Sequence, residues 1–198
     1  MSNFIVKKVA VLGAGVMGAQ IAAHCINARV PVILFDLPGK EGQPRDALAL
    51  RAIEQLKKLS PAPLADAAQA ELIETANFDD HLDKLLQADL IIEAIAERID
   101  WKHQLYAKIG AHIAPHAIFA TNTSGLSITE LASALPAGLR SRFCGVHFFN
   151  PPRYMHLVEL IPTADTQPHI LDQLETYLTS TLGKGVVRAI DKIGRAHV

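Results

Sequence analysis

A histidine and a glutamate twelve residues apart suggest acid–base chemistry. His147 lies in the run FCGVHFFN, at the end of a predicted β-strand, and Glu159 lies in the apolar run HLVELIP. Imidazole can accept a proton near neutral pH, and an adjacent carboxylate can orient the ring and stabilise the imidazolium. Because twelve residues are too many for one helical face, we expect Glu159 to meet His147 from a neighbouring strand, across the FNPPRYM turn.

Two further polar residues could hold a reacting oxygen. Ser124 supplies a hydroxyl and Asn150 an amide, and both could polarise a substrate carbonyl during ketone reduction. The reverse reaction, oxidation of a secondary alcohol, needs a base for the hydroxyl proton, and we assign that role to His147. The alternative is that His147, flanked by Val146 and Phe148, is only a core residue.

A glycine-rich segment, VAVLGAGVMGAQIAAH, predicts a dinucleotide site. Gly13, Gly15 and Gly18 form G-x-G-x-x-G between an apolar strand and a helix. The first glycine permits a tight turn, the second lets a pyrophosphate approach the backbone, and the third allows close packing of helix and strand. We include Val16 and Met17 among the cofactor-binding residues, since the helix N-terminus attracts phosphates.

The second strand supports a dinucleotide and favours NAD. It ends in VILFD, which places Asp36 about twenty residues beyond the motif, where a carboxylate can accept hydrogen bonds from the adenosine ribose. That charge would repel a 2′-phosphate, and no arginine directly follows Asp36 to offset it. FAD-binding domains share the glycine motif, so the downstream residues must decide between the cofactors.

The chain predicts alternating strands and helices. The predicted strands are residues 8–12, 32–35, 90–94, 118–121, 143–147 and 185–191. The predicted helices are residues 17–28, 48–59, 101–113, 128–135 and 170–182. Strict alternation and strands as apolar as LIIEAIA are typical of a doubly wound α/β fold with a mainly parallel sheet covered on both faces.

One segment departs from the short connections of such folds. Residues 39–77 are rich in Ala and Leu and are interrupted by SPAP at residues 60–63. We interpret this segment as a helical hairpin inserted after the second strand.

The composition fits one globular domain. The chain has 198 residues, of which 49% are hydrophobic, and a formal net charge of -1. Such a balance creates no long-range field that would favour nucleic acid or an anionic membrane, and no window approaches a membrane span in apolar length. The N-terminus has no signal-peptide pattern. We expect a cytoplasmic protein that binds neither nucleic acid nor membrane.

The cysteines and the remaining histidines predict no further chemistry. Cys25 and Cys144 lie in apolar segments far apart, which indicates reduced, buried thiols, and we interpret Cys144 as strand packing rather than as a nucleophile. The other eight histidines show no H-E-x-x-H spacing, and no C-x-x-C pair is present. We therefore predict no metal site.

Three blocks, IIEAIAERIDWK, FATNTSGLSI and GVHFFNPPRYMHLVEL, give the chain a specific resemblance to the 3-hydroxyacyl-CoA dehydrogenases over residues 7–191. The resemblance implies a Rossmann-like NAD-binding domain that serves the oxidation of (S)-3-hydroxyacyl-CoA to 3-oxoacyl-CoA in fatty-acid β-oxidation. His147 and Glu159 match the family's catalytic pair, with Ser124 and Asn150 near that histidine and also near the cofactor.

The same resemblance assigns three more residues. It places Glu97, Lys102 and Asn122 along the nicotinamide half of the cofactor, although Lys102 could instead be a solvated lysine on a helix surface. It also implies that the inserted segment contacts coenzyme A, so the expected partner is an acyl-CoA thioester.

The end of the chain departs from the family pattern. In the family a D-T-P-x-F-I-x-N-R segment and a helical domain follow the strand near Val187, whereas here Asp191 is followed by KIGRAHV. The hexapeptide IGRAHV resembles an adapter-encoded tail. We expect residues 1–191 to be the NAD-binding domain, residues 192–198 to be non-native, and the C-terminal helical domain to be absent. The parent would be a homodimer or part of a multifunctional enzyme.

Two other functions remain open. The chain could be a non-catalytic NAD-binding module, which the grouping of His147, Glu159, Ser124 and Asn150 argues against. It could also belong to a dehydrogenase of small hydroxy acids, but those families usually place a catalytic lysine later in the chain. Acyl-chain length and the activity of the isolated chain are not predicted.

Overall fold

A computed structural model describes residues 4–191, so the tail predicted at residues 192–198 lies outside the described residues. Eight strands form one sheet in the order β3-β2-β1-β4-β5-β6-β7-β8. The strands are β1 (Val9–Leu12), β2 (Val32–Asp36), β3 (Ile73–Asn77), β4 (Leu90–Glu93), β5 (Ile118–Thr121), β6 (Phe143–Phe148), β7 (Leu157–Pro162) and β8 (Gly185–Arg188). Every pairing is parallel except β6 with β7, which confirms the mainly parallel, Rossmann-like α/β fold.

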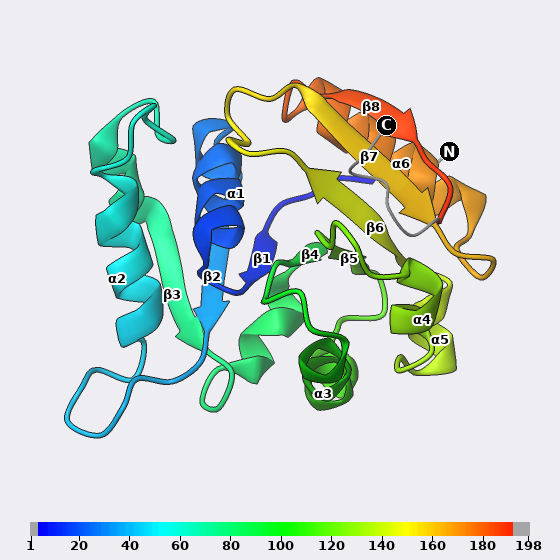
Figure 1. Ribbon diagram of the computed structural model, residues 1–198, viewed down its shortest axis with the longest axis horizontal. Helices are drawn as coiled ribbons and strands as arrows, with labels where there is room; N and C mark the ends of the chain where they lie inside the picture. Colours follow the sequence, from blue (N-terminus) through cyan, green and yellow to red (C-terminus); the bar gives the residue numbers. More distant parts are fainter. Residues whose placement is uncertain (1–3, 192–198) are drawn as a thin grey trace.

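The helices lie on both faces of this sheet (Figure 1). The α-helices are α1 (Val16–Asn27), α2 (Ala47–Leu56), α3 (Ile99–Ile109), α4 (Ile128–Ala132), α5 (Ala137–Arg140) and α6 (Pro168–Ser180). Three 3-10 helices complete the set: η1 (Ala67–Leu72), η2 (Leu82–Gln87) and η3 (Gly110–His112). Among residues 4–191, no helix combines the length and apolar character needed to cross a membrane.

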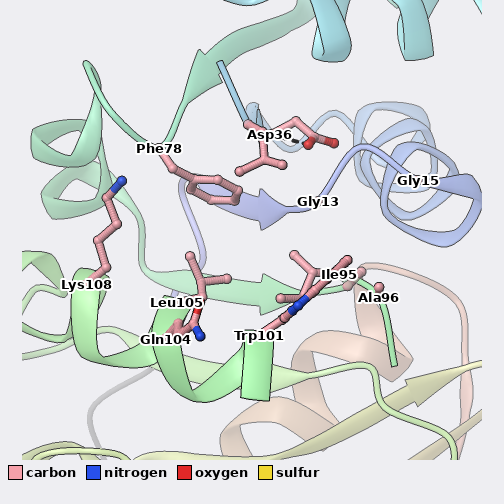
Figure 2. Close-up of a pocket in the computed structure, with 12 residues that line it drawn as sticks. Gly13, Gly15, Asp36, Phe78, Ile95, Ala96, Trp101, Gln104, Leu105 and Lys108 are labelled. Carbon is pink, nitrogen blue, oxygen red and sulfur yellow. Dashed lines mark hydrogen bonds between the residues drawn. The ribbon is translucent and has the colours of Figure 1, made fainter. Parts of the chain in front are cut away.

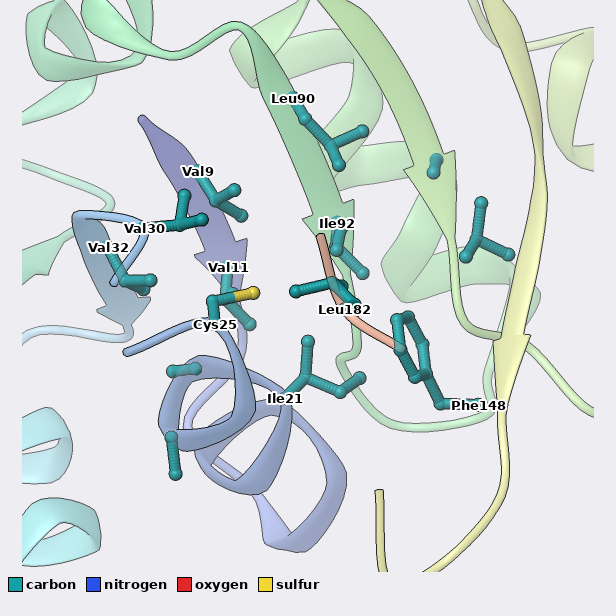
Figure 3. Packing of buried hydrophobic residues seen from close by; sticks show 14 of the residues in the cluster. Val9, Val11, Ile21, Cys25, Val30, Val32, Leu90, Ile92, Phe148 and Leu182 are labelled. Atoms are coloured by element: carbon teal, nitrogen blue, oxygen red, sulfur yellow. The ribbon is translucent and has the colours of Figure 1, made fainter. Parts of the chain in front are cut away.

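Two hydrophobic cores sandwich the sheet, as the alternation along β1 shows. Val9 and Val11 belong to the core formed with α1, α2 and α6, whereas Ala10 and Leu12 belong to the core formed with α3 and α4. Successive strand residues point to opposite faces, so a strand covered on both sides is apolar throughout. Figure 3 shows the first core, where Cys25 of α1 packs among β-strand valines.

Both cysteines are buried, unpaired core residues, as predicted. Cys25 and Cys144 are fully buried, and burial raises the pKa of each thiol to about 12. A thiol with so high a pKa remains protonated near neutral pH and is a poor nucleophile. The interpretation of Cys144 as strand packing therefore agrees with the structure.

The segment of residues 39–77 differs from the expected helical hairpin. It contains one α-helix, α2, followed by bends, the short η1 and the edge strand β3, which pairs in parallel with β2. The prediction of a second α-helical arm is therefore wrong. The sequence IETAN lacks the unbroken apolar run of the central strands because β3, at the sheet edge, buries only Ile73, Ala76 and Asn77.

Candidate active site

The glycine turn between β1 and α1 leaves open space at a helix N-terminus. Gly13 has φ +103° and lies so close to β4 that a Cβ would come 2.9 Å from the carbonyl oxygen of Ala94. A Cβ on Gly18 would come 1.8 Å from the oxygen of Gly13, whereas one on Gly15 would meet nothing within 4 Å. Packing therefore explains two glycines, and the space above Gly15 is free for a ligand. No side chain caps α1, so its first N–H groups can meet phosphate.

Asp36 lies in a cavity beside this turn. Its carboxylate accepts hydrogen bonds from the backbone N–H of Ala14 (2.7 Å) and of Leu37 (2.6 Å). The cavity has a volume of about 540 Å³, and Figure 2 shows Trp101 and Leu105 of α3 on the side opposite Asp36. Apolar walls with a carboxylate at the end of β2 are typical of a site for the adenosine half of a dinucleotide.

A second cavity, of about 440 Å³, lies on the other side of the α1 N-terminus. Its lining combines three of the four predicted catalytic residues, Ser124, His147 and Asn150 but not Glu159, with the first turn of α1: Val16, Met17, Asn122, Ser124, His147, Phe148, Phe149 and Asn150. Gly15 lines the first cavity and Val16 the second, so the glycine turn lies between them. One dinucleotide could therefore extend from Asp36, past the helix N-terminus, to His147.

His147 and Glu159 meet because of strand register. β6 and β7 are antiparallel with His147 directly opposite Glu159, so the two side chains share one face. Nδ1 of His147 lies 2.9 Å from the Glu159 carboxylate, and Nε2 lies 3.0 Å from the Ser124 hydroxyl. A carboxylate can only accept, so in the neutral ring Nδ1 carries the proton and Nε2 accepts from Ser124. The predicted meeting across the FNPPRYM turn is confirmed.

Two asparagines shape the same cavity in different ways. Asn122, at the end of β5, accepts a hydrogen bond from the Phe148 N–H (2.8 Å) and so joins the ends of β5 and β6. Asn150 lies on the loop after β6 and accepts from Gln20 of α1 (3.1 Å). Sequence reasoning missed Gln20, although a polar residue inside the apolar helical run GAQIAAH was a visible signal.

Glu97 supports Ser124 from behind. One carboxylate oxygen of Glu97 accepts hydrogen bonds from the Thr123 hydroxyl and from the backbone N–H groups of Ser124 (2.9 Å) and Gly125 (2.7 Å). Partial burial acts to raise the pKa of Glu97, but these donors outweigh it and the pKa lies below its usual value. Glu97 is not among the lining residues of either cavity, so it acts here on the loop that carries Ser124.

Lys102 does not reach either cavity. Its side chain is 1% exposed and its ammonium donates to Glu93 at the end of β4 (2.6 Å). Glu93 also accepts hydrogen bonds from the hydroxyls of Tyr106 and Thr121 and from the N–H of Ile95. The alternative of a solvated surface lysine is wrong, because α3 turns Lys102 inward to compensate a buried acid. Its placement along the nicotinamide half of the cofactor stays a prediction.

The two cavities together offer polar groups of several kinds. Within residues 4–191, no three His, Cys, Asp or Glu side chains gather in a way that could hold a metal ion. The pair of cavities offers an uncapped helix N-terminus, a carboxylate at the end of β2 and a histidine with an exposed hydroxyl partner. This set fits a nicotinamide dinucleotide and an alcohol or ketone substrate.

Comparison with known sequences identifies the family. The family described as 3-hydroxyacyl-CoA dehydrogenase, NAD binding domain, matches residues 8–192. The chain belongs to this family. Membership in it makes NAD, rather than FAD, the cofactor of this domain.

Relatives with this domain are longer than the chain. A probable 3-hydroxyacyl-CoA dehydrogenase of Deinococcus radiodurans is 43% identical over 189 residues, which is 96% of this chain and 55% of that relative. A putative trifunctional enzyme of a fatty acid oxidation complex from Rickettsia felis is 40% identical, over 96% of this chain and 26% of its own length. The solved 3-hydroxybutyryl-CoA dehydrogenase of Escherichia coli K12 superposes with a TM-score of 0.78 at 30% identity, over 95% of this chain and 39% of that one.

Proposed function

We propose that this chain supplies the NAD-binding and catalytic domain for the oxidation of (S)-3-hydroxyacyl-CoA to 3-oxoacyl-CoA in fatty-acid β-oxidation. The observation that carries the proposal is the Ser124–His147–Glu159 relay, of which Ser124 and His147 line a cavity next to the first turn of α1. Relatives named for this activity match nearly the whole chain.

The relay provides a route for the hydroxyl proton. Nε2 of His147 is the proton acceptor that faces the cavity, and its only hydrogen-bond partner in residues 4–191 is the Ser124 hydroxyl. A substrate hydroxyl placed beside Ser124 can donate to the same nitrogen. The proton then moves to Nε2, and the Glu159 carboxylate at Nδ1 stabilises the imidazolium that forms. NAD, when bound, supplies the acceptor for the hydrogen and electron pair leaving C3.

Ser124 and Asn150 hold the reacting oxygen in this proposal. Both line the cavity with His147, and both are exposed to it. In the reducing direction their donors would polarise the ketone while His147, as imidazolium, returns the proton. Asn122 holds the end of β6 in place, and Glu97 holds the Ser124 loop.

The partner and compartment follow from the same proposal. The substrate is an acyl-CoA thioester, and the parent protein is a homodimer or one part of a multifunctional enzyme, as the similarity to a trifunctional relative supports. The free, buried cysteines support a reducing compartment, for which we propose the cytoplasm.

Titration with NADH and NADPH tests the cofactor half of the proposal. Nicotinamide fluorescence should report NADH binding, and Asp36→Asn should weaken it about 10–100-fold by removing charged hydrogen bonds to the ribose. Asp165→Asn, an exposed change in the β7–α6 turn, is the matched control and should have no effect. Equal affinity for NADPH, or no effect of Asp36→Asn, would contradict the assignment.

Turnover tests the substrate half. Acetoacetyl-CoA should be reduced with NADH, whereas free acetoacetate should not. Reduction of free acetoacetate at the same rate would favour a dehydrogenase of small hydroxy acids. NADH binding without any reduction of acetoacetyl-CoA would favour a non-catalytic module.

A further inference from the structure

Gln20 connects the glycine-motif helix to the loop that carries Asn150. It lies one turn beyond the start of α1, and its side chain is 6% exposed. Its Nε2 donates hydrogen bonds to Oδ1 of Asn150 (3.1 Å) and to the backbone carbonyl of Val16 (3.2 Å). The side-chain amide of Gln20 is therefore held in one place, in direct contact with a residue that lines the second cavity.

The contact with Val16 fixes the orientation of two amides in turn. A backbone carbonyl can only accept, so the Gln20 nitrogen must be the atom that faces Val16. The second N–H of Gln20 then requires an acceptor, and Asn150 can provide one only if its oxygen faces Gln20. The Nδ2 group of Asn150 is left over, and among residues 4–191 it has no hydrogen-bond partner.

We propose that Gln20 is a positioning residue that fixes the Asn150 amide so that its Nδ2 presents an N–H donor to a carbonyl oxygen in the second cavity. Asn150 is exposed there beside His147 and Ser124. The reversed amide would present an oxygen, which repels a carbonyl. The proposal rests on the proposed function for the identity of that carbonyl.

Two carbonyl groups share this chemistry. One is the 3-keto group of the acyl-CoA, and the other is the carboxamide of the nicotinamide ring. Gln20 lies on α1, the helix that begins at the glycine turn. The helix whose N-terminus would meet the phosphates therefore also orients the Asn150 N–H donor in the second cavity. The experiment must therefore separate a substrate effect, a nicotinamide effect and a phosphate effect.

Gln20→Met is the variant of choice, because methionine keeps the length and the helix propensity of glutamine but cannot hydrogen-bond to Asn150. Three quantities are measured: the Kd of NADH, the Kd of ADP-ribose, which lacks the nicotinamide, and kcat/KM for acetoacetyl-CoA. We expect ADP-ribose binding to change less than about twofold. The loss of one neutral hydrogen bond should be about 3–10-fold. If Asn150 binds the nicotinamide carboxamide, we expect this loss in NADH affinity. If Asn150 binds the substrate ketone, we expect it in kcat/KM alone.

The Asn150→Ala background shows whether Gln20 acts through Asn150. There Gln20→Met should change the same quantities by less than about twofold, because the group it orients is gone. Gln20→Glu offers only acceptors to Asn150 and should reverse its amide, so kcat/KM should fall further than in Gln20→Met. In the Asn150→Ala background that extra loss should disappear, whereas a purely structural role would leave it in place.

Several outcomes would overturn the proposal: an equal loss for ADP-ribose, the full effect in the Asn150→Ala background, or no change in any quantity. The side-chain amide signal of Asn150 in ¹H–¹⁵N spectra of the free chain, assigned by its absence in Asn150→Ala, must also shift in Gln20→Met. That measurement needs no ligand, so it tests the contact even if the wild-type chain fails to bind NADH and the proposed function fails.

Discussion

Glu93–Lys102 and His147–Glu159 each pair a carboxylate with a basic side chain, the first between β4 and α3 and the second between β6 and β7, but they differ in which hydrogen-bonding groups remain free. Glu93 accepts four hydrogen bonds, from Lys102, Tyr106, Thr121 and the N–H of Ile95, and both charged side chains are at most 1% exposed. His147 has one nitrogen on a carboxylate and the other on the hydroxyl of an exposed serine that lines a cavity.

The difference separates a structural pair from a chemical one. A buried ion pair is tolerated when every acceptor has a donor, and such a pair has nothing left to offer a substrate. Within the described part of the chain, Nε2 of His147 has one hydrogen-bond partner, Ser124, and a ligand hydroxyl can join or replace that contact. Free hydrogen-bonding capacity at a cavity, rather than burial or charge, marks the reactive group.

Removing the ammonium of the structural pair should have the largest effect. Lys102→Met leaves Glu93 buried without its cation, so the free energy of unfolding should fall by about 3–5 kcal/mol in denaturant titrations. Glu93→Gln combined with Lys102→Met should recover part of that loss, because the charge is gone, while the single amide oxygen can keep the hydroxyl donors of Tyr106 and Thr121. A loss below about 1 kcal/mol for Lys102→Met would mean that the pair is not structural.

Changing the acid of the chemical pair should act on rate instead. Glu159→Gln removes the charge that stabilises the imidazolium, so kcat should fall about 10²-fold while the Kd of NADH stays constant. Glu175→Gln, which removes an exposed partner of Arg188 on α6, is the matched control. If Glu159→Gln lowered stability but not kcat, the two pairs would have the same role.

His24, whose ring contacts a backbone carbonyl rather than a carboxylate, can be compared with His147 through the pH dependence of stability. Burial, and secondly the charge of Lys184, lowers the pKa of His24 from 6.5 to about 4. Below pH 6.5 His24 is therefore protonated in the unfolded chain but stays neutral in the folded chain. Its contribution to stability is present above that pH and is lost as the pH falls towards 4. Between pH 7.5 and 5 the loss should be about 2 kcal/mol.

Denaturant titrations of the wild-type chain and of His24→Gln at both pH values measure this term. The glutamine cannot take up a proton, so its stability should change by about 2 kcal/mol less than that of the wild type over the same interval. An identical change in both proteins would show that His24 is not the group responsible.

The sequence predicted the central elements and the meeting of His147 with Glu159, because both leave local signals. Strands such as β1 and β4 are apolar runs bounded by turns, and the glycine motif lies between β1 and α1 as its spacing requires. The meeting of His147 with Glu159 followed from two strands joined by one turn. The edge strand β3 was missed because it is half-exposed and directly follows the Ala-rich segment AAQAEL, whose composition resembles that of a helix.

Residues whose role depends on side-chain direction could not be predicted. Lys102 lies on α3, and only the packed structure shows that it points inward to Glu93 rather than to the solvent. Gln20, in contrast, does contact a residue of the second cavity. Its partner Asn150 is 130 positions away in the sequence, and nothing in the local pattern specifies that partner. Long-range pairing of polar side chains is decided by tertiary packing.

The most direct test of this account is the rate of NADH oxidation in the presence of acetoacetyl-CoA, compared between the wild-type chain and His147→Asn at saturating NADH. The account predicts turnover by the wild-type chain and a rate about 10³-fold lower in the variant, with the Kd of NADH and the stability of the fold unchanged. A variant that turns over as fast as the wild type would show that His147 is not the base and would contradict the account.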